Sequence, residues 1–180
     1  MRYAALLRGI NVAGKAKVRM PDLRRIFEDL GNRDIQTYLQ SGNVVFSAPP
    51  EAGDAQEVAA GIRRKMISDL DVDVAILLRT GAELTEIVAA SPFLDREEDY
   101  TKLHVTFLDQ VPGEAAVDRF TVPAGESGIP AIIGRNVYLH CPDGYGRTRL
   151  SNVYIEKKLG TVGTTRNWKT VLRLCELAAA

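Results

Sequence analysis

The order of predicted secondary-structure elements restricts this fold more than any other feature, because one βαββαβ order occurs twice along the chain. In the first half, the first helix shows the i, i+3, i+4, i+7 spacing of one apolar face, formed by Leu23, Ile26, Phe27 and Leu30. A tight turn through Ser41 and Gly42 joins two strands as a hairpin. The patterns predict strands at 2–9, 34–40, 43–48 and 72–79, and helices at 21–31, 54–70 and about 82–91.

The same order returns after an acidic stretch at 95–101, which is the expected boundary. Here the patterns predict strands at 103–109, 130–134, 136–141 and 161–166, and helices at 114–120, 151–160 and 167–178. We therefore expect an α+β protein of two ferredoxin-like βαββαβ halves, each followed by an extra helix, at residues 1–94 and 102–180. Helices cover one face of such a sheet, so the other face meets solvent, a partner or the sister half. Pairing of the halves would leave a cleft between them.

The overall charge excludes a strong general attraction to nucleic acid or membrane, because 23 basic residues balance 23 acidic ones. The two cysteines do not make a disulfide framework, and no run approaches the ~18 apolar residues of a membrane span. We expect a soluble cytoplasmic protein, a monomer or homodimer. The charge is uneven, however: residues 1–19 carry five basic residues and no acid, and residues 144–175 carry seven basic residues and one acid.

The stretch "LLRGINVAGKAK" has the spacing of a phosphate-binding P-loop, with Gly9, Gly14 and Lys15 at the required positions. Ala16 follows the lysine where a P-loop needs a hydroxyl for magnesium, and the helix begins only near Pro21. A true P-loop is therefore not expected. The loop can still let backbone amides approach a ligand, with positive charge supplied by Arg8, Lys15 and Lys17.

Four ordered motifs, "RGINVAGKAKV", "YLQSGNVVF", "CPDGYGRTRL" and "TTRNWKTV", resemble the uncharacterised bacterial family called domain of unknown function 1697. The resemblance covers nearly the whole chain. It implies a two-part α+β fold with ferredoxin-like character and no established activity. Family patterns place glycine where this chain has Ala13, often asparagine where it has Ala16, and asparagine where it has Lys169.

The start of the last helix is a second candidate anion site. Asn167 or Thr165 can cap it, and Arg166 and Lys169 place positive charge where the helix dipole disfavours it. An anionic ligand, or a carboxylate of the same protein, would resolve this conflict. Trp168 belongs to an apolar helical stripe and is expected in the core.

The hairpin sequence "LQSGN" has two interpretations. Gln40, Ser41 and Asn43 could contact a ligand at the hairpin tip, or they could serve turn geometry and local hydrogen bonding. No histidine or cysteine spacing matches a zinc site, so no metal is expected. No cofactor is expected either.

The function expected first is binding of a small anionic or phosphate-bearing ligand in the cleft between the halves. The proposed contacts come from three loops, and they are Arg8, Asn11, Lys15, Gln40, Ser41, Asn43, Arg166 and Asn167. One alternative is an enzyme acting on such a ligand, for which Asp143 is the only acid in the motifs. RNA binding and a purely structural module are the others. Under the binding hypothesis, replacing Arg8 or Arg166 by alanine is nearly neutral for stability, because both arginines would lie at the surface.

Overall fold

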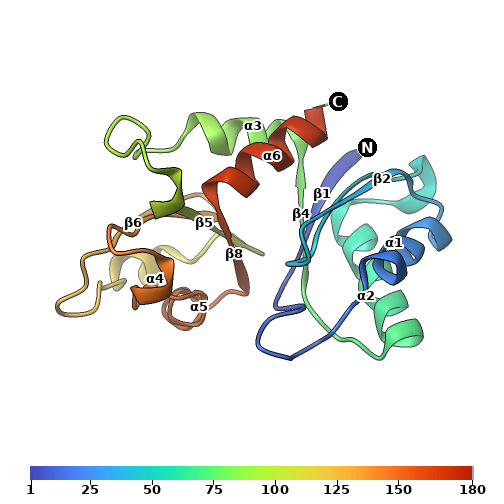
Figure 1. Cartoon of the computed structure of the whole chain (residues 1–180), viewed down its shortest axis with the longest axis horizontal. Helices are drawn as coiled ribbons and strands as arrows, with labels where there is room; N and C mark the ends of the chain where they lie inside the picture. Colours follow the sequence, from blue (N-terminus) through green and yellow to red (C-terminus); the bar gives the residue numbers. More distant parts are fainter. Residues whose placement is uncertain (180) are drawn as a thin grey trace. The chain divides into compact units, whose positions relative to one another are not determined.

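The computed structural model describes residues 1–179, which form two compact units (Figure 1). The first unit comprises residues 1–85 together with the chain from Leu174 onward, and the second comprises Glu86–Arg173. The described residues form two four-stranded antiparallel sheets and six α-helices. The predicted α+β class and the predicted repetition of the element order are confirmed.

The first unit contains one sheet with the strand order β2-β3-β1-β4. Its elements are β1 (Arg2–Leu7), α1 (Met20–Asp29), β2 (Arg33–Tyr38), β3 (Asn43–Ser47), α2 (Ala55–Leu70) and β4 (Ile76–Thr80). Each neighbouring pair is antiparallel, and β1 is central, with Ala5 opposite Val44 of β3 and Leu78 of β4. The N-terminal strand therefore lies in the middle of the sheet, and the loop that follows it begins at the end of that strand.

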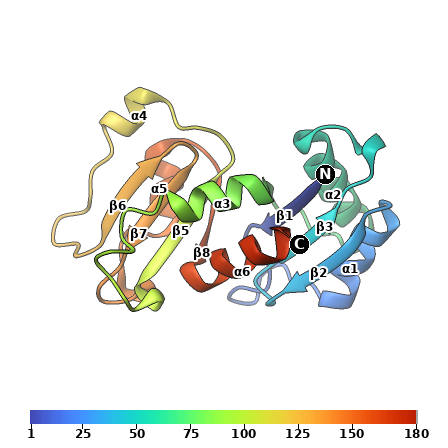
Figure 2. The same cartoon turned by 90° about the horizontal axis from the view of Figure 1, so that it is seen from above.

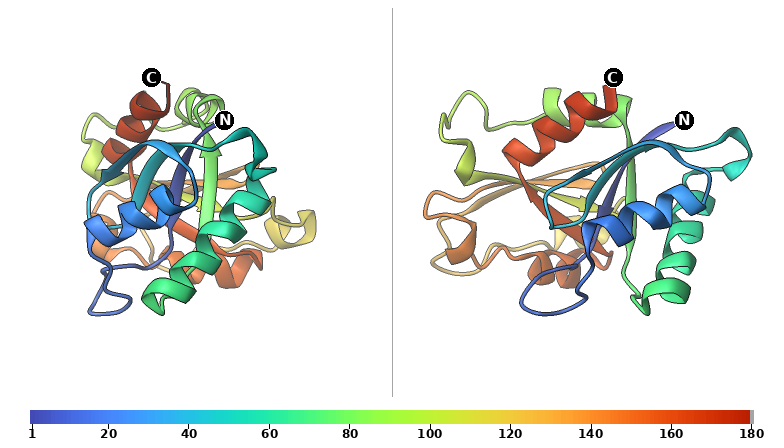
Figure 3. Two further views of the ribbon diagram at one scale, coloured as in Figure 1. Left: turned by 90° about the vertical axis from the view of Figure 1, so that its right-hand side faces the viewer. Right: turned by 45° about the vertical axis from the view of Figure 1, so that its right-hand side comes forward.

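Both helices of this βαββαβ segment pack on one face of the sheet (Figure 3). The α1 stripe buries Leu23, Ile26 and Phe27, as its spacing predicted, and the Phe27 ring meets Phe46 edge-on with 4.9 Å between centroids. Helix α2 begins with a capping box, in which the Asp54 carboxylate accepts from the backbone N–H of Glu57. These contacts form a core between α1, α2 and alternate residues of the strands.

The other face of β1 is buried as well, since Ala4 and Leu6 have no exposed surface. Within the first unit, the C-terminal turn of α6 (Trp168–Ala179) returns to this sheet. The Arg2 guanidinium donates from Nε and Nη2 to the Leu177 carbonyl oxygen, over 3.0 Å in each case. Arg2 thus satisfies a carbonyl that the helix end leaves without a helical partner.

The second unit repeats the architecture with the strand order β6-β7-β5-β8 (Figure 2). Its elements are β5 (Leu103–Leu108), α4 (Glu114–Asp118), β6 (Ile129–Ile133), β7 (Asn136–His140), α5 (Asn152–Leu159) and β8 (Gly163–Asn167). The predicted limits of α5 are confirmed: the Ser151 hydroxyl accepts from the Tyr154 N–H, and Gly160 ends the helix at φ +67°. The core on this side includes Val137, Leu139 and Ile155.

The extra helix after each βαββαβ segment is also present, as α3 (Gly81–Ala89) and α6. Each of these two helices crosses the boundary between compact units, since the boundaries fall at Thr85 and Arg173. In the second unit, the Tyr138 hydroxyl donates to the Ile87 carbonyl over 2.9 Å. The boundary predicted at 95–101 divides the sequence into two consecutive halves. The compact units differ from these halves, because the first unit includes the end of α6 and the second unit includes the end of α3.

Candidate functional site

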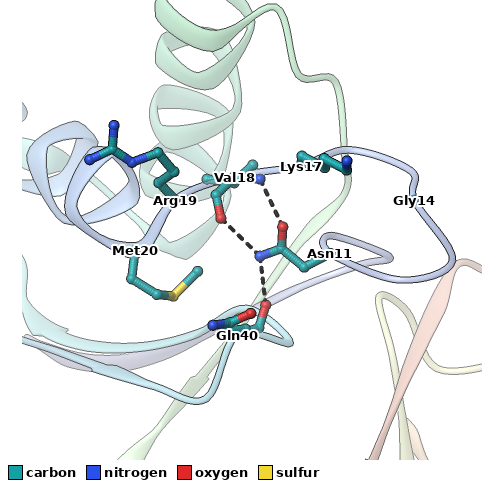
Figure 4. Close-up of a pocket in the computed structure, with 7 residues that line it drawn as sticks. All are labelled: Asn11, Gly14, Lys17, Val18, Arg19, Met20 and Gln40. Atoms are coloured by element: carbon teal, nitrogen blue, oxygen red, sulfur yellow. Dashed lines mark hydrogen bonds between the residues drawn. The ribbon is translucent and has the colours of Figure 1, made fainter.

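A pocket of about 400 Å³ lies in the first unit, beside the loop that joins β1 to α1 (Figure 4). Two predicted segments meet there, the glycine-rich loop and the tip of the β2–β3 hairpin. The residues that line it are Asn11, Gly14, Lys17, Val18, Arg19, Met20 and Gln40. Of the predicted ligand contacts, the structure brings Asn11 and Gln40 together in this pocket.

The loop folds back on itself through a series of left-handed residues. Positive φ angles occur at Gly9, Asn11, Ala13, Gly14 and Ala16. The Lys15 N–H donates to the Val12 carbonyl over 3.0 Å, and the Asn11 N–H donates to the Ala16 carbonyl over 3.1 Å. Glycine adopts positive φ without steric cost and asparagine tolerates it, so Gly9, Asn11 and Gly14 suit this conformation. Ala13 and Ala16 do not, because a Cβ makes positive φ unfavourable.

The Asn11 carboxamide holds the pocket together. Its Nδ2 donates to the Val18 carbonyl over 2.9 Å and to the Gln40 carbonyl over 2.8 Å, and its Oδ1 accepts from the Val18 N–H over 2.8 Å (Figure 4). Both Nδ2 hydrogens are therefore used by the backbone. The sequence suggested Asn11 as a group that orients a ligand directly, and the structure gives it the task of positioning the two walls.

The hairpin tip packs closely on the base of the loop. The Leu7 N–H donates to the Gly42 carbonyl over 2.8 Å, and a side chain at Gly42 would collide with Ile10 and Leu7. Asn43 is fully buried and donates to the Tyr38 carbonyl and to the Ser41 hydroxyl. Of the two interpretations of "LQSGN", turn geometry accounts for Asn43. The Gln40 side chain is exposed and lines the pocket.

The charge of the pocket is positive. Lys17 and Arg19 both line it, and among its seven lining residues, all in the described part of the chain, none carries a carboxylate. Arg19 has an exposed side chain with a long ion pair to Asp22, 3.7 Å from Nε to Oδ2. Lys17 is exposed, and within residues 1–179 no hydrogen bond or ion pair engages its ammonium group. Lys15 is exposed in the same loop but lies outside the lining.

Sequence reasoning did not select Arg19 and Met20 as site residues. They stand at the junction of loop and helix, where Arg19 is the residue before α1 and Met20 is its first residue. The length of the loop up to Pro21 was the available signal. It exceeds the about 2–6 residues that usually connect a strand to a helix, and such long loops are often functional. Arg8, in contrast, is half-buried, and its backbone N–H donates to the Ala75 carbonyl over 3.0 Å.

The remaining predicted contacts, Arg166 and Asn167, belong to the second unit. The placement of Arg166 at the surface is wrong: it is 7% exposed, and its Nη1 donates to the Thr164 hydroxyl over 2.7 Å and to the Thr165 carbonyl over 2.9 Å. Burial lowers the pKa of Arg166 to about 10, which leaves it charged at neutral pH. Asn167 caps α6, because its Oδ1 accepts from the Thr170 N–H over 2.8 Å.

Other titratable groups of the second unit have structural partners. His104 stacks on the Tyr145 ring at 4.6 Å between centroids, and burial lowers its pKa to about 4, so it is neutral at pH 7. His140 contacts the Glu97 carboxylate over 2.9 Å, and Asp143 accepts from the Ser127 hydroxyl over 2.7 Å. Among residues 1–179, no helix has the length and apolar character to cross a membrane.

Comparison with known proteins places the chain in a family. A search of curated proteins found no match. A solved structure of the conserved bacterial protein SP0830 from Streptococcus pneumoniae aligns with a TM-score of 0.72 and 20% identity, over 98% of each chain, so the two proteins share the fold. The family model described as "Protein of unknown function (DUF1697)" matches residues 1–138. The chain, with its repeated βαββαβ order and its glycine-rich first loop, belongs to the DUF1697 family.

Proposed function

We propose that the protein binds a small anionic or phosphate-bearing ligand in the pocket between the β1–α1 loop and the β2–β3 hairpin. The observation that carries the proposal is the pairing of two cationic side chains, Lys17 and Arg19, with a lining that has no carboxylate. Both side chains are exposed, and the ion pair of Arg19 with Asp22 is long, at 3.7 Å. Lys17 and Arg19 can therefore each donate a charge-assisted hydrogen bond to a bound anion. The volume of about 400 Å³ is within the range of about 300–1,000 Å³ typical of small-molecule pockets.

The backbone of the β1–α1 loop leaves room for a ligand. Gly14 adds a segment where no Cβ hinders the approach of a ligand to the backbone.

The proposal assigns different roles to the predicted contacts. Lys17 and Arg19 contact the anion, and Asn11 positions the walls without contacting it. Participation of Arg8, Lys15, Ser41, Arg166 and Asn167 stays a prediction, as does a cytoplasmic location. An enzymatic role has less support, because none of the seven lining residues is a histidine or carboxylate that could transfer protons.

Isothermal titration with inorganic phosphate and pyrophosphate tests the proposal. We expect measurable binding by the wild-type protein and a loss of about tenfold or more in the Lys17→Ala and Arg19→Ala variants, because a charge-assisted hydrogen bond contributes about 1.5–3 kcal/mol. Arg25→Ala is the matched control, since Arg25 is an exposed arginine of α1 outside the lining. Equal binding by all three variants, or no binding of either anion by the wild type, would contradict the proposal.

A further inference from the structure

We infer that the ligand is a nucleotide-type molecule, in which a phosphate is attached to a flat heteroaromatic group. This inference rests on the proposed function and specifies its ligand class. It starts from the composition of the pocket, which has two chemically different parts. Gly14, Lys17 and Arg19 offer backbone and positive charge, whereas Val18, Met20 and Gln40 offer apolar surface and one neutral amide. An inorganic phosphate would use only the first part.

The second part has a suitable surface for a flat ring. Met20 is half-buried at the start of α1, and its packing against the core of the first unit holds it in position. In Figure 4 the thioether end of Met20 extends toward Gln40. Thioether groups make favourable contacts with aromatic rings and adapt to their shape. Together with the buried Val18, Met20 forms an apolar wall where a planar group can lie.

Gln40 supplies the polar group that such a ring requires. Its side-chain amide is exposed, and it offers one acceptor oxygen and one donor nitrogen. This pair matches the adjacent donor and acceptor atoms on the edge of a nucleobase, as glutamine does with adenine. The backbone of Gln40 is held by the bond from Asn11 Nδ2 to its carbonyl over 2.8 Å, so the amide starts from a fixed position.

Asn11 also sets the distance between the two parts. The same Nδ2 donates to the Val18 carbonyl, and Oδ1 accepts from the Val18 N–H. Val18 is the residue between Lys17 and Arg19, so the bonds fix the segment that carries both cations relative to the Gln40 hairpin. A ligand with a charged group and a hydrogen-bonding ring can therefore engage both parts at once, and the two contributions add.

Titration with adenosine 5′-monophosphate, adenosine and inorganic phosphate separates these contributions. We expect adenosine 5′-monophosphate to bind at least tenfold more tightly than phosphate. Gln40→Ala should weaken the binding of adenosine 5′-monophosphate by about 3–10-fold. This is the loss expected for one or two neutral hydrogen bonds of about 0.5–1.5 kcal/mol. The same variant should leave phosphate binding unchanged. Gln36→Ala, at an exposed glutamine of β2 outside the pocket, is the matched control.

The outcomes distinguish the two levels of the hypothesis. If phosphate and adenosine 5′-monophosphate bind equally well, or if Gln40→Ala weakens both to the same degree, the nucleotide inference is overturned and the anion site stands. If neither phosphate nor adenosine 5′-monophosphate binds, both proposals fail. Circular dichroism of Gln40→Ala verifies folding, which the exposed position of its side chain leads us to expect.

Discussion

The Nδ2 of Asn11 donates to the carbonyl oxygen of Gln40 over 2.8 Å, across a separation of 29 positions in the sequence. Through this bond the first loop of the chain is attached to the tip of the next hairpin. Asn11 itself lies at φ +54°, a conformation that asparagine adopts more readily than most residues. One residue thus provides both a permitted backbone turn and the side-chain bonds that define the pocket.

Replacement of Asn11 by alanine should therefore lower the free energy of unfolding by about 1–3 kcal/mol, because backbone groups that it satisfies lose their partner. Urea denaturation monitored by tryptophan fluorescence measures the change. Gln36→Ala removes an exposed amide outside the pocket, so its free energy of unfolding is expected to stay within about 0.5 kcal/mol of wild type. A change for Asn11→Ala in that same small range would show that the side-chain hydrogen bonds of Asn11 add nothing to stability.

Ala13 and Ala16 lie at φ +49° and +43°, where an alanine is strained. The left-handed conformation costs about 1–2 kcal/mol for a residue with a Cβ, and less for glycine or asparagine. Ala13→Gly and Ala16→Asn should each raise the free energy of unfolding, by about 1 kcal/mol or less after the entropy of the unfolded chain is included. Thermal or urea melts give the result.

The control for this pair is Ala60→Gly, on the exposed side of α2. There the backbone is helical, so glycine should destabilise by about 0.5–1 kcal/mol. Opposite signs for Ala13→Gly and Ala60→Gly would verify that the loop backbone decides the effect. Destabilisation by Ala13→Gly would mean that residue 13 does not have a positive φ in solution.

Gly42 and Gly14 form a second matched pair. Both have positive φ, +86° and +76°, but a Cβ at Gly42 would lie 2.8 Å from Ile10 Cγ1, whereas a Cβ at Gly14 meets nothing within 4 Å. Gly14→Ala should cost about 1–2 kcal/mol from the backbone alone. Gly42→Ala should cost clearly more, by a further ~1–3 kcal/mol for overpacking. Denaturant midpoints of the two variants would contradict this explanation if they were equal.

Glu126 should contribute to the pH dependence of stability. Hydrogen bonds from the backbone N–H groups of Arg149 and Gly128 and from the Thr148 hydroxyl hold the pKa of this carboxyl below its usual value. Because the folded-state pKa is the lower one, the stabilisation is complete above the unfolded-state pKa of about 4.3 and is lost as the pH falls through the folded-state pKa. Glu126→Gln should therefore be less stable than wild type at pH 7, and the difference should narrow below about pH 4.

Denaturation at a series of pH values measures that difference, with Glu98→Gln as a control at an exposed position of the same unit. A gap between wild type and Glu126→Gln that stays constant from pH 7 to pH 3 would remove the electrostatic explanation and leave only a loss of packing.

Arg166→Ala is now expected to destabilise the protein, in contrast to the neutral effect that the sequence suggested. The guanidinium is buried and donates to Thr164 and Thr165, so its removal leaves these acceptors without that donor. The expected loss is about 1–3 kcal/mol. Arg147→Ala, at an exposed arginine of the same unit, is the comparison. If urea melts show equal, small effects for both, Arg166 is not a structural residue.

The helices and strands could be predicted from the sequence, because they depend on local periodicity and on local end signals. The stripe of Leu23, Ile26 and Phe27 predicted α1, and Ser151 with Gly160 predicted both ends of α5. The twofold βαββαβ order followed from these elements, and so did the place of Asn167 at the start of α6. Such features need only neighbours within a few residues.

Which loop residues meet, and which residues are buried, depends on contacts between segments that are distant in the sequence. The pocket depends on Asn11 reaching Gln40, and no local pattern specifies a hydrogen bond over that separation. Arg166 showed the same limit: its charge suggested the surface, but residues 164 and 166 share one face of β8 with buried side chains. Charge is a property of a residue, whereas burial depends on the segments that pack against it, so charge alone could not place Arg166.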